Sequence, residues 1–187
     1  MKKLSIIIAT VLFSFGVANA EGDDTHKASH GVEITIPTVT LVDVEGAGGE
    51  AGTINLTPDV SALEAGEAVK FSSANDNSLW LNYTSVVKKD QVRNITSEIS
   101  GNLPSGVSLK LSASTISTGK GKTGQPAEEI SLTSTAQKLI TGIGSCFTET
   151  GNGKGHQLKY TLDMNNEKYA DLMADNYEIT VTYTITD

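Results

Sequence analysis

Hydrophobic and polar residues alternate most regularly at the C-terminal end of the sequence. Ile179, Val181, Tyr183 and Ile185 occupy every second position, with glutamate or threonine on either side of each. Because successive side chains of a β-strand point to opposite faces, this pattern predicts a strand with one apolar and one polar face. We expect these four residues to form a C-terminal core strand in the interior of a sheet, with its threonines toward water.

A second strong alternation covers residues 156–164, where Leu158, Tyr160, Leu162 and Met164 share one face. The pattern predicts another strand whose apolar side chains enter the same core as those of the C-terminal strand. We expect the two strands to pair at the centre of one sheet. Each large side chain buried there contributes about 1.5–3 kcal/mol.

The first alternation in the chain consists of Val32, Ile34 and Ile36, and it ends at Pro37. Proline cannot donate a backbone hydrogen bond, so a strand breaks at this position or lies at a sheet edge. The alternation resumes over residues 39–44, where its parity changes and then changes back. A segment of this kind, which follows a polar stretch, can leave its own domain and pair with an exposed sheet edge of a neighbour. We therefore expect Val32, Ile34 and Ile36 to form an assembly strand.

The remaining alternation is shorter and is separated by turns rich in glycine, asparagine and serine. It predicts strands at residues 53–57, 68–73, 78–86, 92–100, 107–114, 128–135 and 138–143. Within residues 166–175, the spacing of Tyr169, Leu172 and Met173 predicts a turn or two of helix. Many short strands with little helix indicate an all-β protein, and we expect an antiparallel immunoglobulin-like β-sandwich with one short helix.

Residues 1–20 begin with a pair of lysines, continue as an apolar run and end in Ala-Asn-Ala. This is the layout of a secretory signal peptide, and the apolar run is shorter than the roughly 20 residues that a spanning helix needs. We expect a flexible tail at residues 21–31 and a β-sandwich domain at residues 32–187. We expect no membrane insertion of the mature chain.

The net charge bears on which partners the protein can bind, and the cysteine content bears on whether it can form disulfides. The net charge is −8 and no cluster of lysine or arginine is present, which argues against nucleic acid as a partner. The single cysteine, Cys146, cannot form an internal disulfide and lies in a mostly apolar stretch. We expect a buried, inert thiol, and the alternative is a reactive or intermolecular one.

The motifs that resemble known chemical sites are all incomplete. Residues 119–123 lack the first glycine of a P-loop, and residues 142–147 lack the third glycine of a dinucleotide fingerprint. Residues 163–174 lack the glycine and the last carboxylate of a calcium loop, which leaves a looser surface calcium site as an alternative there. His26 and His30 have zinc-ligand spacing, but their segment has no helical pattern. We therefore expect no catalytic residues, no bound metal and no cofactor.

Trp80, the single tryptophan, has the opposite parity to Leu79, Leu81 and Tyr83. On a strand its indole therefore points away from the face that these three residues share. We interpret Trp80 as a core or loop anchor. The alternative is a platform on which a ligand such as a glycan stacks.

Three features together resemble the layout of bacterial fimbrial or pilin-like subunits. They are the signal peptide, the alternating segment at residues 31–39, and the terminal strand whose residues 181–185 read Val-Thr-Tyr-Thr-Ile. Residues 139–186 are also similar to the C-terminal half of uncharacterised secreted β-proteins. The fimbrial resemblance implies pairing with itself or with other surface subunits, and a periplasmic chaperone as a partner.

The leading hypothesis is an exported, non-enzymatic structural or fimbria-like subunit that assembles through β-strand addition. Its location is then the periplasm, the cell surface or the exterior of a bacterium. The alternative is a soluble ligand-binding module with Trp80 at its site, and an enzyme ranks third.

Overall fold

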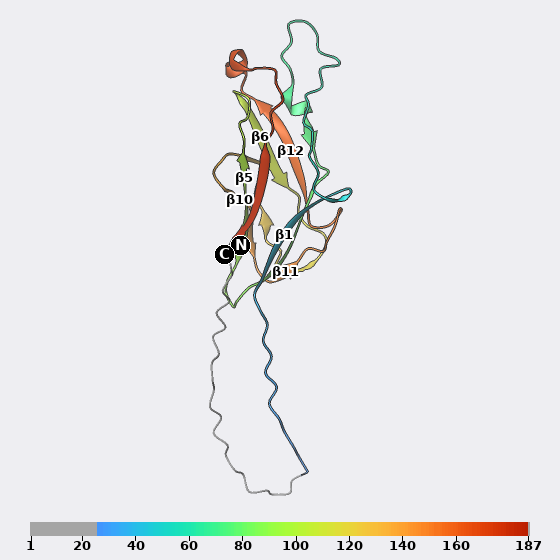
Figure 1. Ribbon diagram of the computed structural model, residues 1–187, viewed down its shortest axis with the longest axis vertical. Helices are drawn as coiled ribbons and strands as arrows, with labels where there is room; N and C mark the ends of the chain where they lie inside the picture. Colours follow the sequence, from blue (N-terminus) through green and yellow to red (C-terminus); the bar gives the residue numbers. More distant parts are fainter. Residues whose placement is uncertain (1–25, 187) are drawn as a thin grey trace, which may run out of the picture. The chain divides into compact units, whose positions relative to one another are not determined.

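The computed structural model describes residues 26–186. The signal peptide predicted at residues 1–20 and the first part of the tail predicted at residues 21–31 lie outside the described residues. The chain divides between Thr35 and Ile36 into two units. Every strand and 3-10 helix of the described residues belongs to the second unit, which Figure 1 shows as a ribbon.

The second unit is built almost entirely from strands, which confirms the predicted all-β class. In chain order they are β1 (Val39–Gly46), β2 (Gly49–Glu50), β3 (Asn75–Asp76), β4 (Trp80–Val86), β5 (Arg93–Ser100), β6 (Val107–Ala113), β7 (Lys120–Gly121), β8 (Gln125–Pro126), β9 (Ile130–Ser131), β10 (Gln137–Ile143), β11 (Cys146–Phe147), β12 (His156–Met164) and β13 (Thr180–Thr186). Two short 3-10 helices interrupt the series, η1 (Phe71–Ser73) and η2 (Asn166–Asp171).

The strands form two antiparallel sheets, as predicted for a β-sandwich. The larger sheet has the order β2-β1-β4-β12-β6-β9, and β3, β7 and β11 pair alongside this path. The smaller sheet has the order β13-β5-β10-β8. Alternate residues of each sheet face the other sheet, and the apolar ones fill the space between them.

Both sheets contribute to one hydrophobic core. The larger sheet supplies Leu81, Tyr83, Leu109, Leu111, Leu158 and Tyr160, and the smaller sheet supplies Ile95, Ile99, Leu139, Ile140 and Ile143. Leu139 and Ile140 are neighbours in sequence, yet both are fully buried. A register shift between Lys138 and Ile140 makes this arrangement geometrically available, because a β-bulge breaks the strict alternation of faces.

The predicted pairing of the two strongest strands is wrong. β12 lies inside the larger sheet between β4 and β6, whereas β13 is an edge strand of the smaller sheet. Alternation identifies which face of a strand is apolar, but it does not identify the neighbouring strand. The two strands do face the same core, from opposite sheets, and the hydroxyl groups of Tyr160 and Tyr183 contact each other across it.

Two predicted strands are absent from the described residues. Residues 53–57 form no strand, and residues 68–73 contain η1 instead. The apolar side chains of Ile54 and Leu56 nevertheless pack against the core. These residues alternate because every second side chain packs against the core, although the segment has no ladder of backbone hydrogen bonds. The sequence pattern of such a segment is the same as that of a strand.

The helix predicted within residues 166–175 is a 3-10 helix that ends at Asp171. The side chain of Asn165 caps it by accepting a hydrogen bond from the Glu167 amide at 3.0 Å. Met173, part of the predicted apolar face, lies beyond the helix and is 66% exposed. The segment therefore has no buried stripe to extend it into an α-helix.

We predict that Leu158→Ala destabilises the domain by about 2–5 kcal/mol, because it removes a fully buried side chain from the central strand β12. Lys159→Ala is the matched control, since Lys159 is the next residue on the same strand and is exposed. It should change the free energy of unfolding by less than about 0.5 kcal/mol. Denaturant unfolding of both variants measures the difference, and equal effects would contradict the core assignment.

Candidate functional site

One long side of the sandwich is closed by the chain itself. β8 pairs with β10 of the smaller sheet, β9 pairs with β6 of the larger sheet, and residues 127–129 connect them. The amide of Leu132 donates to Leu109 O at 2.8 Å, and the amide of Ile99 donates to Thr133 O at 2.9 Å. The crossing backbone therefore bonds to both sheets and covers the space between them.

The other long side of the sandwich is formed by β1 and β13, which lie close together (Figure 1). β13 pairs with β5 along one edge. β1 pairs with β4 along one edge, and β2 covers its other edge at Glu45 and Gly46 alone. Within residues 26–186, no strand pairs with the second edge of β13 or with the second edge of β1 over residues 39–44.

A groove of about 510 Å³ lies between these two strands. Its lining includes Val42 and Val44 from β1, and Val181 and Tyr183 from β13. These side chains point toward the core, yet they are half-buried, whereas Leu158 of the central strand is completely buried. The core is thus incompletely covered on this side of the sandwich.

The groove has the chemical features of a site for an extended peptide. Two strand edges offer backbone N–H and C=O groups, and half-buried apolar side chains line the space between them. An added strand uses edges of this kind for main-chain hydrogen bonds and uses the apolar floor for every second side chain. Asp43, Glu50 and Thr182 give the groove a polar and acidic rim.

The predicted assembly strand is an exposed segment without secondary structure. Val32, Ile34 and Ile36 are 73%, 80% and 77% exposed, and residues 27–38 contain no strand or helix. Glu33 and Thr35 lie between the apolar residues and are also exposed. Single exposed apolar residues are common on protein surfaces and do not indicate a binding site. Three such residues at strand spacing form one continuous apolar face when the segment is extended.

The predicted C-terminal core strand supplies one wall of the groove. Ile179, Val181, Tyr183 and Ile185 are half-buried and pack against the core, and the threonines between them are exposed. The prediction that this strand lies in the interior of a sheet is wrong, because β13 is an edge strand. Val42 and Val44 of β1 supply the opposite wall, and their alternation in the sequence did not indicate this role.

Trp80 lies at the start of β4, opposite Glu45 of β1 and Gln157 of β12. Its side chain is half-buried, whereas Leu81 and Tyr83 of the same strand are buried. Trp80 does not line the groove, nor does it line the second cavity described next.

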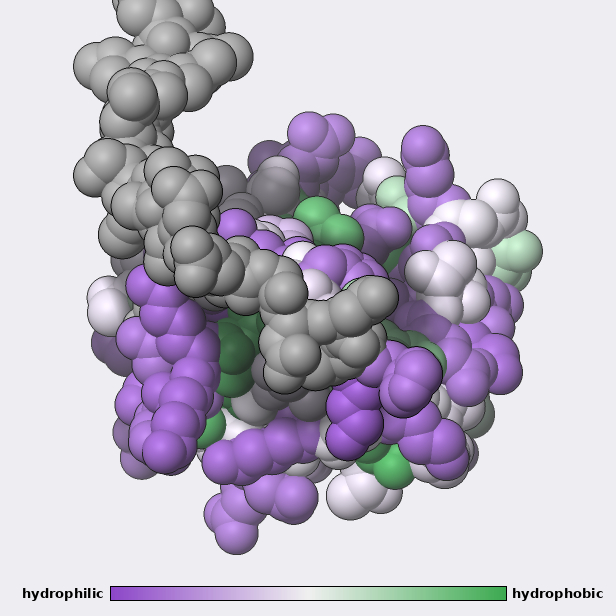
Figure 2. Space-filling model, turned by 90° about the horizontal axis from the view of Figure 1, so that it is seen from below, coloured by the Kyte–Doolittle hydropathy of each residue, from purple (hydrophilic) through white to green (hydrophobic). Residues whose placement is uncertain are grey.

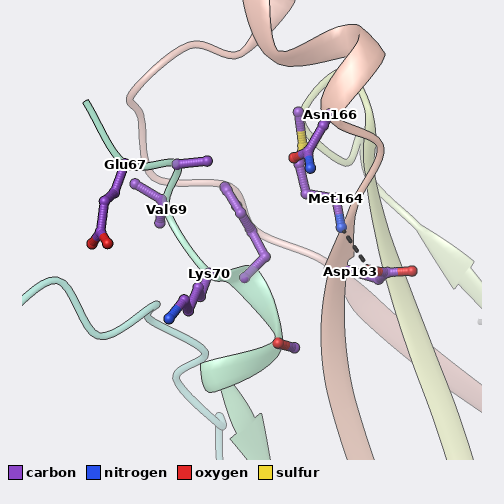
Figure 3. A pocket seen from close by; sticks show the side chains of 9 residues that line it. Glu67, Val69, Lys70, Asp163, Met164 and Asn166 are labelled. Atoms are coloured by element: carbon purple, nitrogen blue, oxygen red, sulfur yellow. Dashed lines mark hydrogen bonds between the residues drawn. The ribbon is translucent and has the colours of Figure 1, made fainter. Parts of the chain in front are cut away.

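A second cavity of about 410 Å³ lies between residues 67–72 and the end of β12. Figure 3 shows Glu67 and Lys70 on one wall and Asp163 on the other. Asp163 accepts a hydrogen bond from the Met164 amide at 3.0 Å and forms an ion pair with Lys110 at 2.7 Å. Its bond to Lys110 keeps the pKa of the Asp163 carboxyl low, so this carboxylate is a charged ion-pair partner at neutral pH.

His156 is buried inside the larger sheet. Its Nδ1 lies 2.6 Å from Ser114 O and its Nε2 lies 2.8 Å from the hydroxyl of Tyr83, which also contacts Thr123 O. A carbonyl oxygen can only accept, so Nδ1 carries the hydrogen in the bond to Ser114. Burial lowers the pKa of His156, and the Ser114 bond offsets part of this effect. The imidazole therefore has a structural role as a neutral ring.

Cys146 is buried at 7% exposure on β11, which confirms the predicted burial. Burial raises the pKa of its thiol, and a backbone hydrogen bond at Ser85 offsets part of this rise. A buried thiol with a raised pKa has little thiolate at neutral pH.

The described residues lack a metal-binding cluster and a membrane-spanning helix. Residues 26–186 contain no group of three or more His, Cys, Asp or Glu side chains that could hold a metal ion. In the same part of the chain, no helix has the length and apolar character needed to cross a membrane. Among the residues that Figure 2 colours by hydropathy, hydrophilic ones form most of the visible face and hydrophobic ones lie in small separate areas.

No protein-family model, no curated protein and no solved structure matches this chain.

We predict that Cys146 reacts slowly with a thiol reagent in the folded protein and rapidly in denaturant, because both burial and a raised pKa suppress the thiolate. Absorbance of a released thiol dye measures both rates. Equal rates with and without denaturant, or a disulfide dimer in the absence of reductant, would contradict this prediction.

We also predict that His156 makes stability depend on pH. The folded protein holds a neutral imidazole with a lowered pKa, so the unfolded chain binds a proton first as pH falls below 6.5, the ordinary value. Stability from this residue is therefore present above that pH and is lost below it. His156→Gln should reduce the difference in unfolding free energy between about pH 7.5 and about pH 5.5, measured by denaturant unfolding. An unchanged difference would show that the imidazole pKa is not lowered.

Proposed function

We propose that this protein is an exported, non-enzymatic structural subunit that assembles through β-strand addition between copies. The observation that carries the proposal is the groove between β1 and β13, whose two facing strand edges are unpaired over most of their length in the described chain. Its occupant is residues 32–36 of a second copy. The proposal agrees with the fimbrial resemblance of the sequence, and it names the groove between β1 and β13 as the acceptor of the added strand.

The segment and the groove match in periodicity and polarity. Val32, Ile34 and Ile36 lie on one face of an extended segment, and the groove floor is apolar. Glu33 and Thr35 lie on the opposite face, which remains toward water. Burying each of the three large side chains contributes about 1.5–3 kcal/mol, and pairing satisfies the backbone groups of both edges.

Export is supported by the sequence of residues 1–20, which has the layout of a secretory signal peptide. An exported domain with an open groove is exposed to aggregation before it assembles, since unpaired edges pair with any available strand. This hazard is the physical reason to expect a periplasmic chaperone that covers the groove until a second copy arrives.

We predict that Ile34→Lys abolishes assembly, whereas Thr35→Lys leaves it intact. Both residues lie in the exposed segment and outside every strand of the structure, so neither substitution alters the packed domain. In the added strand, Ile34 faces the apolar groove and Thr35 faces water. Light scattering and negative-stain microscopy of the full chain, processed by its expression host, measure the assembled mass. Equal behaviour of the two variants would contradict strand addition by this face.

A complementation experiment tests the groove. Val181→Lys places a charge on the groove wall and leaves the segment intact, whereas Ile34→Lys leaves the groove intact. Each variant alone should remain monomeric with a wild-type circular dichroism spectrum. Their mixture should form dimers, because one variant provides a working segment and the other a working groove. The proposal fails if the wild-type chain stays monomeric at high concentration, also after refolding at that concentration.

A further inference from the structure

We infer that residues 36–39 prevent the segment from entering the groove of its own domain, so that the groove receives the segment of a second copy. This inference rests on the proposed function and concerns the choice of occupant. The problem is general, because a segment joined directly to one wall of its own acceptor site has a very high effective concentration there. Assembly between copies therefore requires a barrier to self-insertion.

The first part of the barrier is the parity of the connection. A segment that turned back alongside β1 would form an antiparallel hairpin with it, and directly opposite residues of such a pair share a face. The groove-facing residues of β1 are Val42 and Val44, both even-numbered. Val32, Ile34 and Ile36 therefore reach the groove only in registers that place even-numbered residues opposite one another.

The shortest hairpin, with Pro37 and Thr38 as its loop, fails this test. It places Ile36 opposite Val39 and Ile34 opposite Leu41, and Leu41 is an outward-facing residue with 63% exposure. The favoured two-residue loops also need a positive φ at their first position, whereas the ring of Pro37 fixes φ near −65°. Both the register and the turn are wrong.

A three-residue loop of Pro37, Thr38 and Val39 has the correct parity but needs Val39 in the left-handed region. Such loops end in a residue with positive φ, which a β-branched side chain strongly disfavours. Val39 is also held in β1, where it pairs with Val86 of β4 and its carbonyl accepts a 2.6 Å hydrogen bond from buried Arg93. The hairpin would have to break these contacts.

Of the other three-residue loops of correct parity, residues 35–37 would need Pro37 at positive φ, which its ring forbids, and residues 38–40 would consume Thr40 of β1. The remaining one consists of Ile36, Pro37 and Thr38. It needs Ile36 in the helical region, which is disfavoured directly before proline, and it places proline at the second loop position, where it is also disfavoured. Its third position again requires a β-branched residue, Thr38, in the left-handed region. Every longer loop of correct parity removes Ile36 from the groove, consumes Thr40 of β1, which pairs with Ser85 of β4, or does both.

The test is a pair of substitutions at Val39. Val39→Gly removes the side chain that excludes positive φ, so the three-residue loop becomes accessible and the segment can enter its own groove. Val39→Ala removes most of the same side chain but retains the Cβ that disfavours this conformation. We expect Val39→Gly to be monomeric by light scattering and Val39→Ala to assemble as the wild-type chain does.

Hydrogen exchange then distinguishes self-insertion from simple loss of assembly. In the Val39→Gly monomer, the amides of β13 that do not bond to β5 should exchange at least about tenfold more slowly than in monomeric Ile34→Lys.

Assembly of Val39→Gly would overturn the inference and leave the proposed function standing. A Val39→Gly monomer with unprotected β13 amides would do the same. A monomeric wild-type chain with protected β13 amides would also overturn it, because its groove would already hold its own segment. A monomeric wild-type chain with unprotected amides would contradict the proposed function itself.

A second variant covers the case in which Val39→Gly does not fold. A short Gly-Ser insertion between Pro37 and Thr38 leaves every residue of β1 unchanged and releases the constraints on loop conformation. The long flexible loop permits the register in which Ile34 lies opposite Thr40 and Val32 lies opposite Val42. We expect a monomer with protected β13 amides, and wild-type assembly of this variant would overturn the inference.

Discussion

The structure depends on whether the edge strands of its two sheets are paired or covered. A strand edge carries backbone N–H and C=O groups that need partners when they are buried, so a sandwich core can be fully dry only where its edges are covered. Residues 125–133 provide this cover on one side by pairing with both sheets in succession. No described segment does the same between β1 and β13, and the core residues there remain half-buried.

The two walls of the groove are nevertheless held in place across the core. Arg93 of β5 donates to carbonyl groups of Val39 in β1 and Val86 in β4, which ties the first wall to both sheets. The hydroxyl of Tyr183 in β13 contacts that of Tyr160 in β12, which ties the second wall to the larger sheet. Burial raises the pKa of both tyrosines, so both hydroxyls remain protonated at neutral pH. A groove fixed in this way loses little conformational entropy when a strand enters it.

The sequence predicted which face of each strand is apolar better than it predicted which strands are neighbours. The period of two in residues 156–164 and 179–185 gave the fold class and the core-facing side chains, because burial selects one face of a strand. The same pattern could not show that β12 and β13 belong to different sheets, since residues from both sides of a core look alike. Ile54 and Leu56 alternate as strand residues do and yet pack without a ladder. Arg93 gave no signal, because its burial depends on carbonyl groups that only the folded chain brings together.

The groove depends on these same partners. Val42 and Val44 were visible as alternating residues, but their role as one wall follows from the position of β13, which the pattern did not specify. The exposed segment was easier to find, since an apolar alternation cut off by proline is a local feature.

The sealing of one side by residues 125–133 has a consequence for the geometry of assembly. The described residues, 26–186, provide one such groove and one exposed segment to donate, so every subunit has a valency of two in the proposed assembly. Such a contact joins two different surfaces and is heterologous, and it generates open linear polymers unless the rotation between neighbours closes a ring. Branching would require a second acceptor, which the sealed side does not provide. The length of a polymer would then be set by the supply of subunits that can accept a segment but have none to donate.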